Sequence, residues 1–570
     1  MYNKDNTNNY KSASDVIHQT GVKIHKKNFS KYLNSEQIES INNNILYIHD
    51  SEFFDITLNC CSISLKDIFN DGLIVNGVKY QKPTNLFEIF SQLNIFIVNL
   101  SNEISGGITL VNFDYELANL IDELNIKFPK YDELYNHIHS FFCQINSSNS
   151  RFGNQSAYVT LTIGIGYNEN QAIVCKGVLE ALLKGCGKNL PFIFPNVIFR
   201  VKKGINKNKN DKFNTLYDLS LKTTSSQMNP TYILADSKMN MDINPLHLHI
   251  VGCRSRLLKT LNGDNYGVGR TNIGSVSINL VRMALDSKNL DDFYKNLKYQ
   301  IELSCQILIK KQDILKSISL ENSPLLKYNN LLYPFNDNID DILNEASLAI
   351  GFIGCAEMAQ ILKPNSSIEK EYALINDILS TMKNICEELS KKYNKIVTLI
   401  GSSGEKISYY FYQNDKNKNA KIYNSKLKKG YYTNSFHIPV DRLVNIIEKL
   451  SLEGKNHELC NGGGISYVEI SYNKNNLESF KDIINLAELR HINYLGFNFQ
   501  KNVCAECGNS VEGKICDNCK SEKIIKIRRV SGYLGYLNSF SLGKKIEEGL
   551  RVKHTDIVKK WYLFYNNIIL

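Results

Sequence analysis

From Ile45 onward, short apolar runs alternate with longer stretches in which apolar residues recur every three to four positions. Short runs rich in Val, Ile and aromatic residues predict strands, whereas the three-to-four spacing predicts helices. Alternation of the two along a chain is typical of an α/β sheet or barrel. We therefore expect an α/β fold. The predicted strands span residues 157–165, 192–201, 274–280, 396–400, 407–412 and 465–470.

Two long amphipathic helices are predicted, at residues 291–315 and 369–391, and both should pack one apolar face on the sheet. Residues 1–44 carry only scattered apolar positions and predict a tail or a loosely docked helix. The Lys- and Asn-rich segments 202–212 and 413–421 are interpreted as surface loops. After residue 497 the composition changes to a Cys-rich segment followed by a basic, Gly-containing tail, which predicts a domain boundary there.

Composition narrows the class of protein. The 570 residues are 43% hydrophobic, with 26 Phe and 32 Tyr, which excludes a disordered chain. The net charge of +10 is spread along the sequence and favours anionic partners of any kind without naming one. We find neither an export signal nor an apolar run long enough to span a membrane, so we expect a soluble, cytoplasmic protein. In that reducing compartment the 14 cysteines favour thiol and metal chemistry over a disulfide framework.

Four cysteines near the C-terminus have the spacing of a metal site: Cys504-x2-Cys507-x8-Cys516-x2-Cys519. Each close pair places two thiolates on one tight turn, so that four sulfur atoms can surround one ion. Zinc is the metal that this set favours, and four thiolates leave no open coordination position, so the site is expected to be structural. By itself such a zinc ribbon could equally belong to a nucleic-acid-binding module.

Residues 529–535, Arg-Val-Ser-Gly-Tyr-Leu-Gly, follow shortly after the last of these cysteines. Spacing alone favours a turn. The string also resembles the loop on which glycyl-radical enzymes store an unpaired electron, and the cysteine pairs just upstream make it similar to the anaerobic (class III) ribonucleotide reductases. A Cα radical must be planar and conjugated with both flanking amides, and a Cβ would crowd that plane. The resemblance therefore implies a radical on Gly532.

Further short strings occur in the order that this family shows, from about residue 40 to 555. Any one of them is weak, but so many in order are hard to obtain by chance. They are Ile48-His49-Asp50, Asn59-Cys60-Cys61, Val251-Gly252-Cys253-Arg254-Ser255, residues 269–274 (Gly-Arg-Thr-Asn-Ile-Gly), 351–354 (Gly-Phe-Ile-Gly), 432–437 (Tyr-Thr-Asn-Ser-Phe-His), 462–469 (Gly-Gly-Gly-Ile-Ser-Tyr-Val-Glu), 542–544 (Leu-Gly-Lys) and 551–554 (Arg-Val-Lys-His).

The resemblance implies a ten-stranded α/β barrel, built from two five-stranded parallel halves, with a central finger loop and a small C-terminal zinc and glycyl-radical module. The implied domains are an N-terminal tail or helix (1–44), the barrel (45–497), the zinc module (498–524) and the radical loop with its tail (525–570). The family's optional ATP-binding cone needs some 90 residues before the first barrel strand, whereas only about 45 precede it here. We therefore expect that domain to be absent.

The resemblance also assigns roles to single residues. Cys253 matches the finger-loop cysteine that becomes a thiyl radical, and Cys60 matches the cysteine that hands a hydrogen to the substrate face bearing the 2′-hydroxyl. Cys61 should point to the other side of the strand and serve packing. Asn272 stands where thioredoxin-dependent relatives carry a second cysteine, and an amide cannot form a disulfide. A lone Cys60 fits the branch of the family that oxidises formate, although Asn272 could also be a simple turn residue.

One segment departs from the family pattern. Relatives commonly carry a Pro-Ala-Glu turn that helps to hold the substrate phosphates, whereas this chain has Gly401-Ser402-Ser403-Gly404-Glu405. Glycines and serines can still offer N–H and hydroxyl donors to a phosphate. We therefore expect these five residues at the substrate. His49 and His437 are interpreted as structural hydrogen-bonding residues rather than bases.

The implied function is oxygen-independent reduction of ribonucleoside triphosphates to deoxyribonucleotides, with structural zinc, a glycyl radical and formate as co-substrate. The implied partners are an S-adenosylmethionine-dependent [4Fe–4S] activating enzyme, (d)NTP effectors and a second copy of the chain, with no membrane and no direct nucleic-acid contact. One alternative is another glycyl-radical enzyme such as a pyruvate formate-lyase, which also uses adjacent cysteines. Another is a non-catalytic zinc-ribbon protein that binds nucleic acid. Cys355, next to Gly354, is the unassigned cysteine that most needs inspection.

Overall fold

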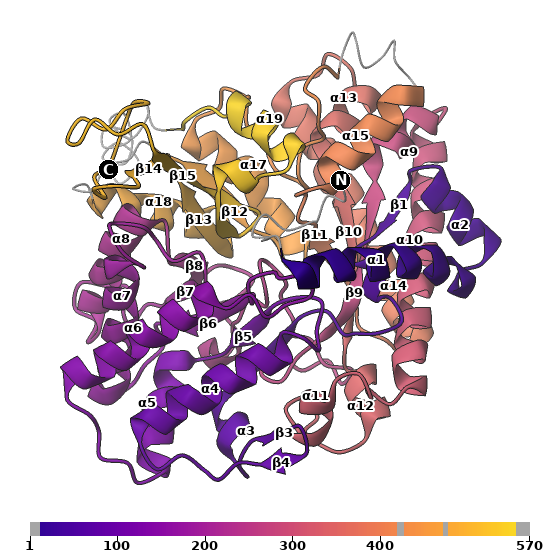
Figure 1. The fold of residues 1–570 in the computed structure, drawn as a ribbon. Coiled ribbons are helices and arrows are strands. Elements are labelled where there is room, and N and C mark those ends of the chain that lie inside the picture. The colour runs from indigo at the N-terminus through magenta and orange to yellow at the C-terminus, as the bar shows by residue number, and fades with distance from the viewer. Residues whose placement is uncertain (1–11, 419–426, 471–476, 555–570) are drawn as a thin grey trace.

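The structure is a computed structural model that describes residues 12–418, 427–470 and 477–554. The expected α/β class is confirmed: helices enclose a set of mostly parallel strands (Figure 1). The expected N-terminal helix is present as α2 (Ser35–Asn42), and α1 (Ala13–Asn28) precedes it. No helix in the described ranges combines the length and apolar character needed to cross a membrane.

Five parallel strands form the first half of the strand arrangement, and they pair in the order β2-β5-β6-β7-β8. Their side chains are buried on both faces, as is usual when helices cover a parallel sheet. The strands are β2 (Cys61–Ile63), β5 (Ile108–Leu110), β6 (Val159–Ile163), β7 (Asn196–Val201) and β8 (Thr231–Leu234).

A second set of strands runs parallel among themselves: β9 with β10 and β11, and β12 with β13. A parallel bridge between Ile400 and Gly463 connects the two groups. The two halves meet antiparallel, through β13 and β8 at one seam and through a Cys61–Thr271 bridge at the other. The strands are β9 (Asn272–Asn279), β10 (Ser347–Ile353), β11 (Val397–Gly401), β12 (Ser466–Glu469) and β13 (Tyr494–Asn498), with β1 (Leu46–Ile48) antiparallel on β9.

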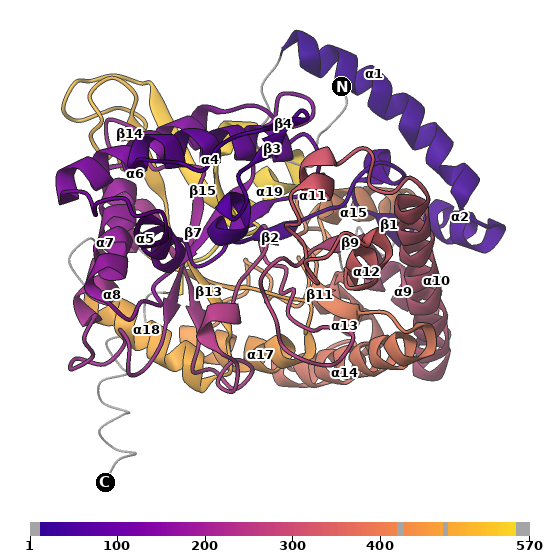
Figure 2. The same ribbon diagram turned by 90° about the horizontal axis from the view of Figure 1, so that it is seen from below.

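Helices surround the strands on the outside (Figure 2). The predicted amphipathic pair is confirmed as α10 (Leu290–Ser317) and α14 (Ile368–Tyr393), and their apolar faces are buried. The other long helices are α4 (Leu86–Leu100), α5 (Phe113–Glu123), α6 (Tyr131–Ser147), α7 (Glu169–Lys184), α8 (Asn214–Gln227), α17 (Ile446–Leu459) and α18 (Leu477–Leu489). Shorter elements are α3 (Leu65–Phe69), α9 (Leu280–Asp286), α11 (Pro324–Tyr328), α12 (Ile339–Asn344), α13 (Cys355–Leu362) and the hairpin of β3 (Ile74–Val75) and β4 (Val78–Lys79).

One predicted strand is wrong. Residues 407–412 begin the helix α15 (Ile407–Lys418), which also takes up the start of the predicted loop at 413–421; residues 419–421 lie outside the described part. The aromatic and β-branched residues of this segment favoured a strand. However, Ile407, Phe411 and Asp415 are all buried, and their spacing of four places them on one helical face. The tertiary environment selects the helical period.

The C-terminal part forms a separate three-stranded antiparallel sheet of β14 (Lys501–Cys504), β15 (Ile524–Val530) and β16 (Tyr533–Tyr536), followed by α19 (Leu542–Leu550). This sheet crosses the boundary expected between residues 524 and 525. Cys504, the last residue of β14, is therefore linked to the glycine loop through one sheet. Ser531 and Gly532 form the turn of the β15–β16 hairpin, with φ of +44° and +125°.

Candidate active site

A tight loop carries Cys253 at its tip. Val251 and Ser255 pair across the loop, and Gly252 adopts a φ of +63°, which favours glycine. Thr160 on β6 donates its hydroxyl to the Gly252 carbonyl at 3.2 Å. On the far side of the tip, Arg254 donates to carbonyls at the end of β11. The loop thus reaches from the first half of the strands to the second.

The tip of this loop lies against Gly532. A Cβ placed on Gly532 would come within 2.5 Å of the Cys253 carbonyl oxygen and 2.8 Å of the Cys253 Cβ. No side chain fits in that space. Two residues far apart in sequence are therefore in van der Waals contact, and the contact depends on the absence of a side chain at position 532.

Cys60 lies beside the same loop tip, just before β2. A Cβ on Gly252 would be 3.1 Å from the Cys60 sulfur. The N–H of Gly107 donates to this sulfur at 3.2 Å, and burial raises the pKa of the Cys60 thiol to about 12. The thiol is therefore protonated at neutral pH, the state in which it can give up a hydrogen atom. Cys61 is fully buried among core side chains on the other side.

Asn272 holds the backbone of Cys60. Its side-chain carbonyl accepts the Cys60 N–H at 2.8 Å, and its amide donates to Asn59 at 3.4 Å. The side chain is buried, and it is not among the residues that line the cavity next to Cys60. Asn272 is thus placed to position Cys60.

A cavity of about 180 Å³ opens between Cys60 and Cys253. Both cysteines line it, and so does Tyr533, the neighbour of Gly532. Side chains from both halves of the strand arrangement complete the wall. Its other polar lining residues are His18, His49, Asp50, Glu52, Asn59, Ser105, Arg151, Gln155, Thr160, Asn196, Ser403, Glu405 and Lys406.

The predicted phosphate segment divides between this cavity and the core. Ser403 and Glu405 line the cavity just before the N-terminus of α15. Gly401 ends β11, and the buried Ser402 hydroxyl lies 2.6 Å from that of Ser277. A Cβ on Gly404 would meet the Ser408 hydroxyl oxygen at 2.3 Å, so Gly404 allows a close backbone approach. Only two of the five predicted residues reach the cavity.

Glu405 also contacts the glycine hairpin. The Tyr533 hydroxyl donates to Glu405 at 2.6 Å, and the Tyr533 ring packs on Tyr158 and Phe194 at centroid distances of 5.5 and 5.7 Å. These contacts seat the hairpin against the cavity wall. They raise the pKa of Tyr533 well above its usual range, chiefly through burial and the Glu405 charge.

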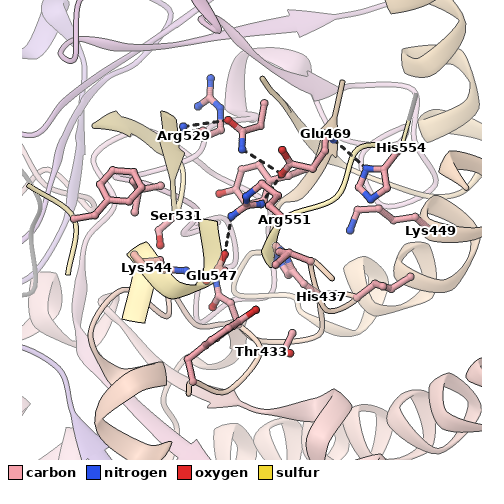
Figure 3. A pocket seen from close by; sticks show the side chains of 18 residues that line it. Thr433, His437, Lys449, Glu469, Arg529, Ser531, Lys544, Glu547, Arg551 and His554 are labelled. Carbon is pink, nitrogen blue, oxygen red and sulfur yellow. Dashed lines mark hydrogen bonds and ion pairs between the residues drawn. The ribbon is translucent and has the colours of Figure 1, made fainter. Parts of the chain in front are cut away.

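Behind the hairpin lies a second, smaller cavity of about 50 Å³ (Figure 3). Arg551 forms ion pairs with Glu469 at 2.5 Å and with Glu547 at 2.8 Å. His554 accepts the Glu469 N–H at 3.0 Å through Nδ1. Residues 544–554, which follow the hairpin, are thereby anchored to β12, and Glu548 among them accepts from Arg528 on β15 at 2.7 Å.

The four C-terminal cysteines fit one metal ion. Their sulfur atoms all lie within 4.8 Å of one another, and the Cys504–Cys519 and Cys507–Cys516 pairs are 3.4 and 3.6 Å apart. Tetrahedral zinc with Zn–S bonds of about 2.3 Å requires sulfur atoms about 3.8 Å apart. The donor set and its spacing therefore match a closed structural zinc site.

Comparison with known proteins decides the family. The family model described as NRDD, anaerobic ribonucleoside-triphosphate reductase, matches residues 5–554. The anaerobic ribonucleoside-triphosphate reductases of Enterobacteria phage T4 and Haemophilus influenzae are 27% and 26% identical, over 90% and 93% of this chain and 90% and 80% of theirs. The chain belongs to the anaerobic ribonucleoside-triphosphate reductase family.

Solved structures agree at the level of the fold. The anaerobic ribonucleotide reductase from Thermotoga maritima in complex with dATP and CTP aligns with a TM-score of 0.71 at 18% identity, over 94% of this chain and 90% of that one. A hydroxyproline dehydratase from Clostridioides difficile aligns less well, with a TM-score of 0.54 at 12% identity, over 84% of this chain and 69% of that one. The enzyme class expected from the sequence is thus confirmed as anaerobic ribonucleoside-triphosphate reductase.

In this reductase, several cavity residues were not found from the sequence. Arg151 stacks on the Tyr158 ring at 4.2 Å, and Asn196 begins β7. Neither residue stands in a recognisable motif. The Asn- and Ser-rich composition around residue 150 was a signal for Arg151 only, and Asn196 had none. Arg254 and Arg529 stand within the quoted motifs, but the sequence gave them no role.

Three residues weighed from the sequence lie as follows in the reductase. His49 lines the cavity and its Nε2 lies 2.7 Å from the Ser277 hydroxyl oxygen, whereas His437 lines the smaller cavity. Burial holds the pKa of His437 well below its usual range. Cys355 is buried at the start of α13 and is absent from the lining of the 180 Å³ cavity.

Proposed function

We propose that this reductase converts ribonucleoside triphosphates to 2′-deoxyribonucleoside triphosphates with a radical stored on Gly532, and that formate is the reductant. The observation that carries the proposal is the contact of Gly532 with Cys253, together with the cavity that Cys253 shares with Cys60. A hydrogen atom can pass from the Cys253 sulfur to Gly532 without leaving the protein. The resulting thiyl radical faces the space in which a ribose fits.

In the proposed reaction, the Cys253 thiyl removes the 3′-hydrogen of the ribose. The 2′-hydroxyl then leaves as water, and Cys60 supplies a hydrogen on that side. Formate and one proton convert the 2′-C–OH group into C–H, with carbon dioxide and water as the other products. The 3′-hydrogen finally returns from the Cys253 thiol. Protonated Cys60, held by Gly107 and Asn272, supports its role as hydrogen donor.

Formate is favoured because the family resemblance places the second thiol of thioredoxin-dependent relatives at position 272, where this chain has Asn. Asn272 hydrogen-bonds the Cys60 backbone and does not line the cavity. Among the described residues, Cys60 and Cys253 are the cysteines that line the cavity. A disulfide that ends in a thioredoxin-type exchange would consume Cys253 itself, so an external two-electron donor suits this site.

The substrate phosphates are proposed to bind at the N-terminus of α15, where Ser403 and Lys406 line the cavity. Free N–H groups and the helix dipole favour anions at such an end. Gly401, Ser402 and Gly404 would shape the turn behind these donors. Glu405, which accepts from Tyr533, is proposed to link substrate binding to the hairpin.

The remaining assignments extend from the family. We propose that zinc binds Cys504, Cys507, Cys516 and Cys519, that an S-adenosylmethionine-dependent [4Fe–4S] enzyme generates the radical, and that the chain acts as a homodimer with (d)NTP effectors. The T. maritima reductase carries dATP in a specificity site, which supports an effector site here. We further propose that residues 45–497 form a ten-stranded barrel around the Cys253 loop. Residues 1–44 would precede it as a tail or helix, and residues 498–524 and 525–570 would follow it as the zinc module and the radical loop with its tail.

Electron paramagnetic resonance after anaerobic incubation with the activating enzyme and S-adenosylmethionine tests this proposal. We expect a glycyl doublet, and then deoxynucleotide formation only when a ribonucleoside triphosphate and formate are both present. A doublet without reduction of any nucleotide would point to a glycyl-radical enzyme for another substrate. The absence of a radical together with the absence of product would refute the proposal.

A further inference from the structure

Two buried guanidinium groups contact the carbonyls on either side of the Gly532 Cα. Arg254 donates through Nη2 to the Ser531 carbonyl at 3.1 Å. Arg529 donates through Nη1 to the Gly532 carbonyl at 3.2 Å. The two peptide units that flank Gly532 are thus each bonded to a cation, and the two cations come from different parts of the chain.

Neither guanidinium has a carboxylate partner within 4 Å among the described residues. The remaining bonds of Arg254 go to the carbonyls of Gly401 and Ser402 at 3.1 and 3.0 Å. Those of Arg529 go to the carbonyls of Phe497 and Met228, and burial lowers the pKa of Arg529. Burying a cation without a counter-ion is costly, so two such residues at one glycine call for a specific purpose.

The neighbouring ion pairs show that carboxylates are close by but engaged elsewhere. Figure 3 shows Arg529 and Ser531 at the edge of the cavity in which Arg551 pairs with Glu469 and Glu547. Glu469 and Glu547 are thus bound to Arg551 and Lys544. Glu405 accepts from Tyr533, and Glu548 pairs with Arg528. The positive charge of Arg529 remains directed at main-chain carbonyls.

We propose that Arg254 and Arg529 are positioning residues that set the electronic structure of the Gly532 radical through its two flanking carbonyls. The inference rests on the function proposed above. An unpaired electron on Cα spreads into the carbonyl of the same residue and receives density from its own amide nitrogen. Charge-assisted hydrogen bonds to these carbonyls change both effects, and they act strongly in a buried site.

The two arginines act in opposite directions. A cation at the Gly532 oxygen draws spin from Cα onto that carbonyl. A cation at the Ser531 oxygen draws the nitrogen lone pair of the Ser531–Gly532 amide away from Cα, which leaves more spin on Cα. Together they tune the equilibrium in which a hydrogen atom moves from the Cys253 sulfur to the Gly532 Cα and the radical moves the other way. No other oxidant or reductant takes part in that exchange.

The splitting of the glycyl doublet measures the spin on Cα, because it arises from the remaining α hydrogen. We expect Arg529→Met to widen the splitting and Arg254→Met to narrow it, and Arg529→Lys to restore part of the wild-type value. Arg528→Met is the matched control. Arg528 is the adjacent arginine on β15, but it bonds to Glu548 and Asn502 on the other side of the strand. We expect its splitting to equal that of the wild type.

A measurement on the wild type covers the case in which the buried variants fail to fold. Electron–nuclear double resonance on protein made with ¹⁵N-guanidino arginine, in H₂O and in D₂O, should reveal an exchangeable proton and a ¹⁵N nucleus coupled to the radical. The inference would be overturned if folded Arg254→Met and Arg529→Met proteins had the same doublet splitting as the wild type. It would also be overturned if the wild type showed no ¹⁵N coupling to the radical. In both cases the proposed function would stand. A wild type that forms no radical would overturn both.

Discussion

The Cα of Gly532 packs directly on the main chain of Cys253: a Cβ added to the glycine would lie 2.5 Å from the cysteine carbonyl oxygen. This contact joins the C-terminal hairpin to the loop that faces the cavity. It makes position 532 intolerant of any side chain, both by space and by its φ of +125°. The close approach of the hairpin to the Cys253 loop therefore requires glycine at position 532.

The first prediction concerns that contact. Gly532→Ala should give a soluble protein that binds nucleotide but shows no glycyl doublet and no turnover, because the methyl group displaces the hairpin and obstructs hydrogen abstraction. Gly513→Ala is the control, since nothing lies within 4 Å of a Cβ at that position. Resonance spectra and a nucleotide-binding titration on both variants check this expectation. A normal doublet in Gly532→Ala would move the radical to another residue.

The second prediction concerns the metal. Cys507→Ser should reduce the zinc content from about one ion per chain to nearly none, because a four-thiolate site loses its closed geometry. The radical yield should fall with it, since β14 next to the site pairs with β15 of the hairpin. The strands and helices of residues 45–497 should stay folded.

On one preparation, elemental analysis measures the zinc content, circular dichroism the folding, and electron paramagnetic resonance the radical yield. Cys143→Ser, a half-buried cysteine on α6, should keep both zinc and radical. Full radical yield in metal-free Cys507→Ser would show that the hairpin does not depend on the ion.

The third prediction concerns the reductant. Turnover should require formate, and label from ¹⁴C-formate should appear as carbon dioxide in step with deoxynucleotide. Cys60→Ser should abolish both products, by at least about 1,000-fold, while the Gly532 radical still forms, because the hydrogen donor is lost and Cys253 remains. Cys355→Ala, at a residue that does not line the cavity, should keep both products. Repeated turnover with a thioredoxin system and no formate would contradict this reading.

The fourth prediction is a pH effect on stability. Burial lowers the pKa of Lys311 from 10.5 to about 8, and no carboxylate among the described residues lies within 4 Å of its ammonium group. Below pH 8 the folded chain must hold this buried cation, which costs up to about 3 kcal/mol relative to the unfolded chain. As the pH rises from 8 towards 10.5 the cost disappears, because both states become neutral.

Lys311→Met should therefore raise the thermal midpoint at pH 7 and do so much less at pH 10. The exposed neighbour Lys310, changed to Met, should have little effect at either pH. Thermal scans of the wild type and both variants at the two pH values make the comparison. An equal gain at pH 7 and pH 10 would assign the stabilisation to better packing instead.

Candidate functional residues could be predicted from the sequence where they stand together in one short segment. The four cysteines combine residue type and spacing whose chemistry needs no tertiary information. The Arg-Val-Ser-Gly-Tyr loop and the Gly-Cys-Arg motif were assigned roles through their resemblance to the family. The helices α10 and α14 were also predictable, because their apolar positions repeat along 28 and 26 residues. Such features report forces that act between close neighbours in the chain.

Only the tertiary structure decided how these strings meet. Residues 407–412 form a helix, and Asn272 hydrogen-bonds the Cys60 backbone. Arg254 and Arg529 donate to the two carbonyls on either side of the Gly532 Cα. These contacts join residues up to 277 positions apart in the sequence. They result from the packing of many helices and strands at once. A short-range pattern of apolar and polar residues predicts single elements, but it does not determine how those elements pack together.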